Sequence, residues 1–354
     1  MKLQEARIGY AGYSRDFSVP GDRRRFAAYA RLKGLPIEYA EVDRDYDLAY
    51  VTYSSDLPGW IARKRREGDR LKLVFELIDA YLTETGILRR LAKGTARYLL
   101  GTDSRLSPDL RSTLIAAAEH ADAVICSTEE QRQTIGRYNA NVFTSFDHFG
   151  DELGPPKCDY RRDGPLRLVW EGQSTTLENI QSIRGVLNGF RKDIELHVVT
   201  DPMVYRYSGR FGRRDSREAL RRIECPIHFH PWRRGSFANQ VTAADVAIIP
   251  IDLCDAMARG KPENKLVMLW QLGMPVLASD TPAYRRAMNG AGIGLNCASE
   301  EEWGAHLEAL IAADGADLER IGSQCRTYAE TAYSKADFMD RFDRALEAVG
   351  FSSN

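Results

Sequence analysis

Short β-rich runs alternate with helical stretches along the whole length of this 354-residue chain. The runs are almost continuously apolar, as are strands that a sheet buries on both faces. This alternation predicts an α/β fold with parallel sheets. We expect strands within residues 6–13, 37–42, 48–53, 71–78, 123–127 and 141–145 of the first half, and within residues 166–172, 194–201, 226–232, 246–251, 275–280 and 292–297 of the second.

The chain is longer than one hydrophobic core usually supports, which predicts two domains. The composition shifts to glycine, proline and charged residues at residues 149–165, where we place the linker. We therefore predict two doubly wound, Rossmann-like domains at residues 1–155 and 160–330, followed by a helix within residues 331–354. Ligands of such sheets bind beyond the carboxyl ends of the strands, so the loops there are the candidate site.

Charge and cysteine content exclude several classes of protein. Lys and Arg number 49 against 50 Asp and Glu, a net charge of -1, which argues against a nucleic-acid partner. The six cysteines form no Cys-x-x-Cys pair, so we expect neither a zinc module nor a disulfide framework. No apolar run approaches the ~20 residues of a membrane span, and the first residues lack the apolar core of a signal peptide. We expect a cytoplasmic protein, either free or peripheral on the inner face of a membrane.

The segment KPENKLVMLWQLGMPVLASD, residues 261–280, predicts a helix followed by a buried strand. Residues 261–264 have the composition of a helix start, and Gly273 suits a left-handed helix end. Pro275 cannot prolong the helix, so the next apolar run begins a strand. Because a helix N-terminus carries partial positive charge and N–H donors, the start of this helix is a natural phosphate site.

Six motifs follow one another along the chain: ADAVICSTEEQR, LRLVWEGQSTTLENI, ADVAIIP, ENKLVMLWQLGMPVLASDTPAYRRAM, GIGLNC and EEEWGAHLEALI. In this order they resemble the GT-B glycosyltransferases, in particular the large retaining group of bacterial polysaccharide transferases, which is glycosyltransferase family 4-like. The first motif is similar to the closing strand and helix of that family's first domain. The others are similar to its donor domain, so the resemblance spans nearly the whole chain.

The resemblance implies two domains that face each other across a cleft, with a C-terminal helix that crosses back to the first domain. It implies an enzyme that moves a sugar from a nucleotide-sugar donor to a saccharide or lipid-linked saccharide acceptor. Retention of anomeric configuration, metal independence and a role in bacterial surface polysaccharide or glycoconjugate synthesis are further implications. No cofactor is expected, since the nucleotide sugar is a substrate.

The chain departs from the family at a Glu-x7-Glu pair that often contacts the donor. Alignment on GMPV, residues 273–276, puts Gly260 and Met268 at these two positions, so both carboxylates are missing. The identity of the donor therefore stays open. Three other functions also stay open: a sugar-nucleotide epimerase of the same fold, a non-catalytic protein that binds nucleotide or sugar, and an NAD-dependent enzyme. The last is disfavoured because Gly9 and Gly12 form no Gly-x-Gly-x-x-Gly pattern.

On the donor side, Lys265 is suited to the pyrophosphate as a charge added to the helix N-terminus, and Glu263 to a sugar hydroxyl. Gly172 would allow close approach of the backbone, and Trp232 could stack on a nucleobase. Each residue also has a purely structural interpretation. Lys265 would then be an exposed helix lysine and Glu263 a carboxylate that favours the helix start. Gly172 would belong to a plain strand-to-helix turn, and Trp232 would pack under a loop. We expect Lys265 and Glu263 to be catalytic, and the donor-binding residues to be Gly172, Gln173, Ser174, Trp232, Lys261, Asn264 and Thr281.

On the acceptor side, Asp79 and Tyr81 follow a buried strand at a position where GT-B members often keep an acidic or histidine residue beside the reacting sugar. Asp79 is therefore the third catalytic candidate, with a helix N-cap as its structural alternative. The loop after the first strand is expected to face the cleft. The acceptor-binding candidates are Gly12, Tyr13, Arg15 and Tyr81.

No metal site is expected. His228 and His230 alternate along one strand and so share a face, but no third ligand follows nearby in the sequence. Asp43 and Asp45 form an Asp-x-Asp pattern, but they precede a strand, where a ligand loop should follow one. We interpret them as a solvated turn.

Basic clusters recur at residues 22–26, 62–67 and 88–97. They are interpreted as solvated helix faces, or alternatively as a rim that attracts anionic lipid or a lipid-pyrophosphate acceptor. Interleaved aromatic residues, which a nucleic-acid stacking platform needs, are not evident. In STEEQR, Ser127 is expected to cap a helix.

Overall fold

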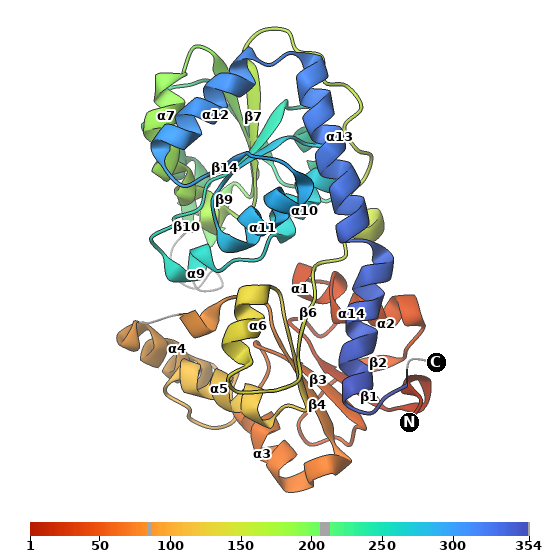
Figure 1. Ribbon diagram of the computed structural model, residues 1–354. Coiled ribbons are helices and arrows are strands. Elements are labelled where there is room, and N and C mark those ends of the chain that lie inside the picture. Colours follow the sequence, from red (N-terminus) through yellow and green to blue (C-terminus); the bar gives the residue numbers. More distant parts are fainter. Residues whose placement is uncertain (84–85, 206–212, 353–354) are drawn as a thin grey trace. The chain divides into compact units, whose positions relative to one another are not determined.

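The computed structural model describes residues 1–83, 86–205 and 213–352, and the chain divides into two units (Figure 1). The first unit comprises Met1–His148, Gly260–Pro262 and Ser334–Asn354. The second comprises Phe149–Arg259 and Glu263–Tyr333. Each unit contains one six-stranded sheet. Among the described residues, no helix combines the length and apolar character needed to cross a bilayer.

The sheet of the first unit is entirely parallel, with strand order β2-β1-β3-β4-β5-β6. Its central strands are buried on both faces, which explains their continuous apolar sequences. All six strands predicted in the first half are confirmed. They are β1 (Ile8–Ala11), β2 (Ile37–Tyr39), β3 (Leu48–Thr52), β4 (Lys72–Leu77), β5 (Ala123–Cys126) and β6 (Val142–Thr144).

The helices of this unit are α1 (Pro20–Arg23), α2 (Phe26–Lys33), α3 (Leu57–Glu67), α4 (Ile87–Leu99), α5 (Leu110–His120), α6 (Glu129–Ile135) and α14 (Lys335–Ala348), with 3-10 turns at η1 (Leu3–Glu5), η2 (Gly68–Arg70) and η3 (Tyr81–Thr83). The C-terminal helix α14 packs on α2, β5 and β6 (Figure 1). Its Phe342 is fully buried and stacks on Tyr29, with ring centroids 5.0 Å apart. The expected return of the chain to its first domain is confirmed.

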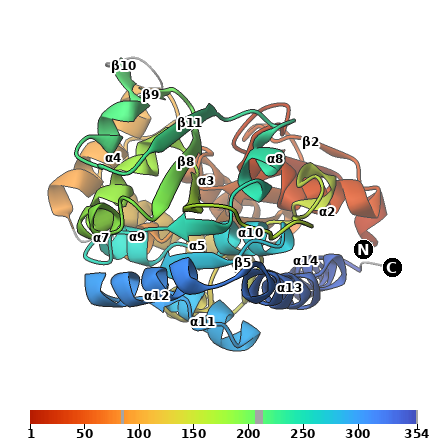
Figure 2. The same cartoon turned by 90° about the horizontal axis from the view of Figure 1, so that it is seen from above.

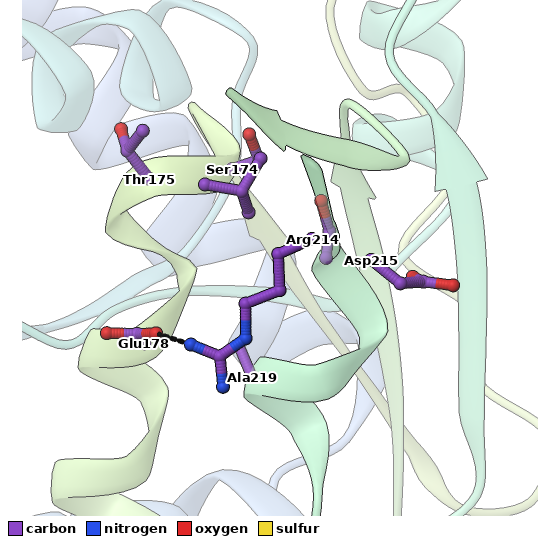
Figure 3. Close-up of a pocket in the computed structure, with 8 residues that line it drawn as sticks. Ser174, Thr175, Glu178, Arg214, Asp215 and Ala219 are labelled. Atoms are coloured by element: carbon purple, nitrogen blue, oxygen red, sulfur yellow. Dashed lines mark hydrogen bonds and ion pairs between the residues drawn. The ribbon is translucent and has the colours of Figure 1, made fainter. Parts of the chain in front are cut away.

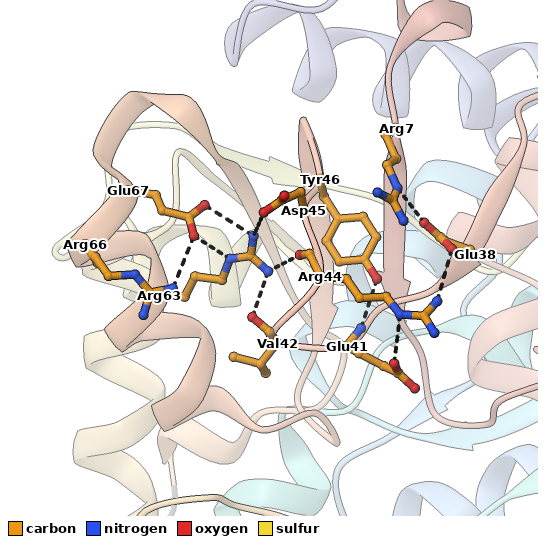
Figure 4. Close-up of polar contacts among 10 residues, drawn as sticks. All are labelled: Arg7, Glu38, Glu41, Val42, Arg44, Asp45, Tyr46, Arg63, Arg66 and Glu67. Carbon is orange, nitrogen blue, oxygen red and sulfur yellow. Dashed lines mark hydrogen bonds and ion pairs between the residues drawn. The ribbon is translucent and has the colours of Figure 1, made fainter.

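Two local predictions in this unit have clear outcomes. Thr128, not Ser127, caps α6, because the Thr128 side chain accepts the Gln131 N–H while the Gln131 side chain bonds back to the cap. The Asp43–Asp45 run is an exposed turn, as predicted. Arg63 holds that turn by donating to Val42 O at 2.7 Å and to Asp45 at 3.3 Å (Figure 4).

The sheet of the second unit is also parallel, with order β11-β8-β7-β12-β13-β14. Its strands are β7 (Leu166–Glu171), β8 (Ile194–Thr200), β11 (Ile227–Pro231), β12 (Val246–Ile249), β13 (Val276–Ser279) and β14 (Asn296–Cys297). The six predicted strands are again present. Only β14 is much shorter than predicted, because Gly292, with φ of 66°, closes the preceding helix instead of starting a strand.

Helices cover both faces of this sheet (Figure 2). One apolar cluster includes residues of α8 (Phe237–Thr242), α10 (Asn264–Gln271) and α11 (Pro282–Ala291), and the other includes residues of η5 (Ser174–Ile183), α7 (Arg184–Gly189) and α12 (Glu300–Ala312). A short antiparallel hairpin of β9 (Met203–Tyr205) and β10 (Arg213–Asp215) was not predicted. The helical elements are η4 (Gly150–Glu152), η5 (Ser174–Ile183), α7 (Arg184–Gly189), η7 (Ser216–Leu220), α8 (Phe237–Thr242), α9 (Ala256–Arg259), α10 (Asn264–Gln271), α11 (Pro282–Ala291), α12 (Glu300–Ala312) and α13 (Gly315–Ala332).

The turn between α10 and β13 has the predicted form. Gly273 adopts φ of 74°, a left-handed conformation that favours glycine after a helix. Its carbonyl oxygen accepts a hydrogen bond from the Tyr160 hydroxyl at 2.7 Å. This turn directs the chain from the buried helix α10 into the buried strand β13.

Candidate functional site

The loop after β7 lies at the carboxyl edge of the second sheet. Thr200, the last residue of β8, donates its hydroxyl to Gly172 O at 2.6 Å, and Gly172 N donates to Val199 O at 3.2 Å. The Gly172 backbone is therefore fixed between two neighbouring strands. A side chain at this position would collide with the ammonium group of Lys265 and displace it, so glycine here allows the close approach of Lys265.

Helix α10 brings its first turn to the same loop. Lys265 Nζ donates to Glu171 O at 2.6 Å and lies 4.9 Å from the centroid of the Trp170 ring. A lysine at the N-terminus of a helix adds a full charge to the partial positive charge of the helix dipole. Gly172, Lys265 and the start of α10 thus lie together and form one electropositive corner.

Glu263 occupies the N-cap position of α10 and is only 7% exposed. Its Oε1 accepts hydrogen bonds from the Tyr333 hydroxyl at 3.1 Å and from Arg286 at 3.4 Å. Its Oε2 is buried and has no hydrogen-bond partner among the described residues. Burial raises the pKa of Glu263. The carboxylate thus ties the start of α10 to α11 and to the end of α13.

The other donor-side candidates differ in whether their polar groups already form hydrogen bonds within the protein. Gln173 is exposed at the N-cap of η5, whereas Ser174 is buried and donates to Met203 O at 3.1 Å. The Thr281 hydroxyl caps α11 by accepting the Tyr284 N–H. Gln173 is therefore the most accessible polar side chain of this group.

Trp232 follows β11 and packs against the apolar cluster that includes residues of α8, α10 and α11. Its indole N–H donates to Glu171 Oε1 at 3.1 Å, and its ring stacks on Phe237 with centroids 5.7 Å apart. Glu171 was not selected from the sequence. Its position at the carboxyl end of a buried strand was the signal that could have identified it.

A small pocket opens between η5, the β9–β10 hairpin and η7 (Figure 3). Ser174 and Thr175 line it, and Arg214 bridges to Glu178 at 3.1 Å. Its volume of about 70 Å³ is well below the several hundred Å³ of typical ligand sites. This pocket is too small for a nucleotide sugar.

In the first unit, Asp22 organises the loop that follows β1. Its carboxylate accepts hydrogen bonds from the Tyr10 hydroxyl at 2.7 Å, from Tyr13 N at 2.8 Å and from Ser14 N at 2.9 Å. A side chain on Gly12 would collide with Asp22. Asp22 therefore fixes the loop that contains the predicted Gly12 and Tyr13, and Asp22 itself was not selected from the sequence.

Arg15 lies on the exposed part of the same loop, 3.8 Å from Glu41 and over the ring of Tyr39. Lys261 lies in the Gly260–Pro262 segment, which groups with the first unit. Asn264, by contrast, is the first residue of α10 in the second unit.

Asp79 and Tyr81 follow β4 at the carboxyl edge of the first sheet. Burial raises the pKa of Asp79, whose side chain accepts no hydrogen bond from the residues that the structure describes. The cap expected of a purely structural Asp79 is thus not seen. The Tyr81 ring stacks on Tyr53, with centroids 4.2 Å apart.

A buried charge network lies beneath these loops. Arg25, which is fully buried, donates to Glu76 at 2.6 Å and lies 3.4 Å from an Asp147 oxygen. Burial raises the pKa of both carboxyl groups. No sequence pattern indicated this network, because Arg25 stands in the basic cluster at residues 22–26, which we interpreted as a solvated helix face.

No protein-family model matches this sequence, and no curated protein shows significant sequence similarity to it. Solved structures of GT-B glycosyltransferases do share its fold. Anabaena HepE in complex with UDP and glucose matches with a TM-score of 0.64 and 12% identity, over 97% of this chain and 100% of HepE. Sucrose-phosphate synthase from Thermosynechococcus elongatus matches with a TM-score of 0.58 and 15% identity, over 91% and 75%. S. aureus TarM in complex with Fondaparinux, alpha-GlcNAc-glycerol and UDP matches with a TM-score of 0.55 and 11% identity, over 86% of this chain and 55% of TarM.

Proposed function

We propose that this chain is a glycosyltransferase that moves a sugar from a nucleotide-sugar donor to a saccharide or lipid-linked saccharide acceptor. The observation that carries the proposal is the electropositive corner of Gly172 and Lys265 within a GT-B fold that matches HepE over 97% of the chain. HepE structures contain UDP or UDP-glucose, which makes uridine-linked sugars the first donors to try.

The donor diphosphate would lie at the start of α10. There, Lys265 and the helix dipole would stabilise the negative charge that develops on the leaving phosphate. A fixed positive charge does this without a divalent ion, so we propose metal-independent transfer. Glu263 would contact the sugar, and the remaining donor contacts would come from Gly172, Gln173, Ser174, Trp232, Lys261, Asn264 and Thr281.

The first unit would present the acceptor. We assign Asp79 the task of accepting a proton from the acceptor hydroxyl, since a partly buried carboxylate with a raised pKa is a suitable general base. Gly12, Tyr13, Arg15 and Tyr81 would position the acceptor. We further propose retention of anomeric configuration and a role in bacterial surface polysaccharide or glycoconjugate synthesis, both on the strength of the family resemblance.

Helix α4 supports a peripheral membrane contact. Its polar side is docked on the protein, because Arg90 pairs with Asp109 at 3.1 Å and Arg97 with Asp103 at 2.7 Å. Gly94 packs closely on the Pro108 backbone. The helix therefore turns its apolar side to solvent, the reverse of an ordinary surface helix. The large exposed apolar residues of α4 and the segment after it are Ile87, Leu88, Leu91, Tyr98, Leu99, Leu100 and Leu106.

We propose that this apolar side inserts into the surface of an anionic membrane. Arg89 and Arg105 are exposed next to Leu88 and Leu106 in the chain, which suits anionic headgroups. The basic cluster at residues 62–67 contributes less than expected, since Arg63 and Lys64 are bound within the protein. Membrane contact would place the enzyme beside a lipid-linked acceptor.

A donor panel tests the proposed function. The full chain is screened by thermal shift against nucleoside diphosphates and their sugars, because a ligand that binds only the folded state raises the melting temperature. Donors that bind are then incubated with and without candidate saccharide acceptors, and release of the nucleotide is measured. We expect release that depends on the acceptor.

Other outcomes identify the alternatives. Conversion of the donor sugar without an acceptor would identify an epimerase. Binding of the donor with neither transfer of its sugar nor slow hydrolysis would identify a non-catalytic protein. The absence of carboxylates at Gly260 and Met268 would agree with that outcome. Stabilisation by NAD and by no nucleotide sugar would contradict the proposal.

A further inference from the structure

Three potential metal ligands lie on one face of the second sheet, on the neighbouring strands β8 and β11. His197 of β8 pairs directly with His228 of the edge strand β11. Glu195 precedes His197 by two residues and so shares its face. The side chains of Glu195, His197 and His228 each offer one ligand atom, and these atoms all lie within 4.8 Å of one another. Pairing across strands supplies the third ligand that the sequence around His228 did not show.

The distances suit a small tetrahedral site. Glu195 Oε2 lies 3.4 Å from His228 Nε2 and 3.9 Å from His197 Nε2. Bonds of about 2.0–2.1 Å from zinc place two tetrahedral ligand atoms about 3.3–3.4 Å apart. One distance therefore already fits, and the second needs to shorten by about 0.5 Å. The third, between the ligand atoms of His197 and His228, is at most 4.8 Å, so the two imidazoles have to draw together when the ion binds.

His197 is prepared for metal binding by its neighbours. Its Nε2 is buried and has no hydrogen-bond partner among the described residues, although it faces the carboxylate of Glu195. Its Nδ1 lies 3.1 Å from His230 Nε2, which can accept a hydrogen bond from it. Metal-binding histidines commonly use the second ring nitrogen in this way, because the hydrogen bond fixes the tautomer that leaves the first nitrogen bare.

The charges around the cluster agree with a cation. Arg167 of β7 lies opposite Glu195 in the sheet, but its guanidinium pairs with Asp245 at 2.7 Å. The Glu195 carboxylate thus faces His197 and His228.

We propose that Glu195, His197 and His228 bind one Zn²⁺ ion, with a water as the fourth ligand and His230 as the residue that orients His197. Two imidazoles and one carboxylate favour zinc over magnesium or calcium, which prefer oxygen ligands alone. His197 lies three residues before the end of β8, about 10 Å from the carboxyl edge of the sheet. The ion therefore has a structural role: it fastens the edge strand β11 to β8.

Calorimetry on the full chain, first stripped with a chelator, tests the site. We expect Zn²⁺ to bind with a stoichiometry of one, and Mg²⁺ to show no binding. Glu195→Gln and His228→Gln should each weaken zinc binding about ten-fold or more. Both positions are partly exposed, so these variants should fold. His306→Gln on α12, which removes a histidine outside the cluster, should bind as tightly as the wild type.

A second readout separates this site from other zinc-binding groups. Zinc should raise the melting temperature of the wild type and of His306→Gln by the same amount, and that of Glu195→Gln by less. The proposal is overturned if zinc does not bind, or if both cluster variants bind it as tightly as the wild type. The second result would place the ion elsewhere, for example at the exposed Cys158 or Cys254.

Discussion

At the scale of single residues, Lys265 is the side chain on which the donor site depends most. We expect Lys265→Ala to lower kcat/KM by ~100-fold or more, the usual loss on removing one fixed charge from a transition state. Steady-state kinetics with the best donor of the panel measures this loss. Because Lys265 also bonds Glu171 O, the melting temperature is recorded in parallel. Activity within a few-fold of the wild type would remove the proposed role, whatever the change in stability.

A substitution at Gly172 tests the electropositive corner by changing the space beside its backbone. In Gly172→Ala the new methyl group would displace the Lys265 ammonium group, so we expect donor binding to weaken by about ten-fold or more. Titration calorimetry with the donor measures the change. Gly304→Ala on α12 is the matched control, because a methyl group there meets no other atom. Equal donor affinity in both variants would show that the close approach of Lys265 to the loop is unimportant.

The role proposed for Asp79 predicts how the activity depends on pH. If its carboxylate accepts a proton from the acceptor, activity falls as the pH drops through its pKa, which burial raises above the ordinary 3.8. We expect Asp79→Asn to lower kcat by 10²–10⁴-fold and to remove this acidic limb. The pH profile of kcat/KM checks both. A variant that keeps wild-type activity at all pH values would exclude Asp79 from the chemistry.

Stability provides the independent readout for Asp79. A raised pKa means that folded Asp79 still binds a proton at pH values where the unfolded residue has lost it. The free energy of unfolding therefore falls as the pH rises from about 3.8 through the raised pKa. Asp79→Asn cannot ionise, so its melting temperature at pH 7 should equal or exceed that of the wild type. A lower value would indicate that the carboxylate is structural.

Sequence reasoning at this scale found residues at the ends of predicted elements and missed buried polar groups. Lys265 and Gly172 could be selected because they stand at a helix start and after a strand. Asp22 and the Arg25–Glu76 pair could not, because their roles depend on partners distant in the sequence: Arg25 and Glu76 are 51 positions apart. Burial of a charged group is a tertiary property that local composition does not report.

At the scale of elements, α4 has the most unusual orientation. Leu88 is 84% exposed and Leu99 is 75% exposed. If they enter a bilayer, Leu88→Asp/Leu99→Asp should weaken binding to anionic vesicles by about 100-fold, since each buried leucine contributes about 1.5 kcal/mol or more. Vesicle sedimentation measures the binding. The melting temperature should not fall, because neither side chain contacts the core.

A matched control for α4 is Gln133→Asp, which adds a charge to the exposed side of α6. It should bind vesicles as the wild type does. If the α4 double variant also binds normally, the exposed leucines have another partner and the membrane proposal is wrong.

Elements marked by long apolar runs or by glycine and proline at their ends were predicted correctly. Short, partly polar elements were missed. The strands and the α10–Gly273–β13 turn follow from apolar runs and from glycine and proline chemistry. The β9–β10 hairpin was missed because its strands are three residues each and are exposed or polar in part. The segment after Gly172 forms a 3-10 helix over Ser174–Ile183, and side-chain periodicity over so short a span does not distinguish a 3-10 helix from an α-helix.

At the scale of the whole molecule, we propose different tasks for two sheets of the same design. In each, the candidate ligand residues lie in loops at the carboxyl edge, as the doubly wound topology requires. The histidine cluster of β8 and β11 is the exception, because it lies within the sheet. Its position could not be deduced from the sequence, since the register that pairs His197 with His228 is set by packing of the two strands.

The separation of these two sites predicts different responses to a chelator. Excess EDTA should leave the transfer rate within about two-fold of its starting value, because Lys265 supplies the charge that a metal ion supplies in other transferases. The same treatment should lower the melting temperature of the wild type, since at 100 times the dissociation constant a bound ion contributes about 2.7 kcal/mol to folding. Glu195→Gln, which lacks a ligand, should show a smaller difference in melting temperature with and without EDTA than the wild type does. Loss of transfer in EDTA that Mg²⁺ or Mn²⁺ restores would contradict the metal-independent mechanism, whereas an unchanged wild-type melting temperature would contradict the zinc site alone.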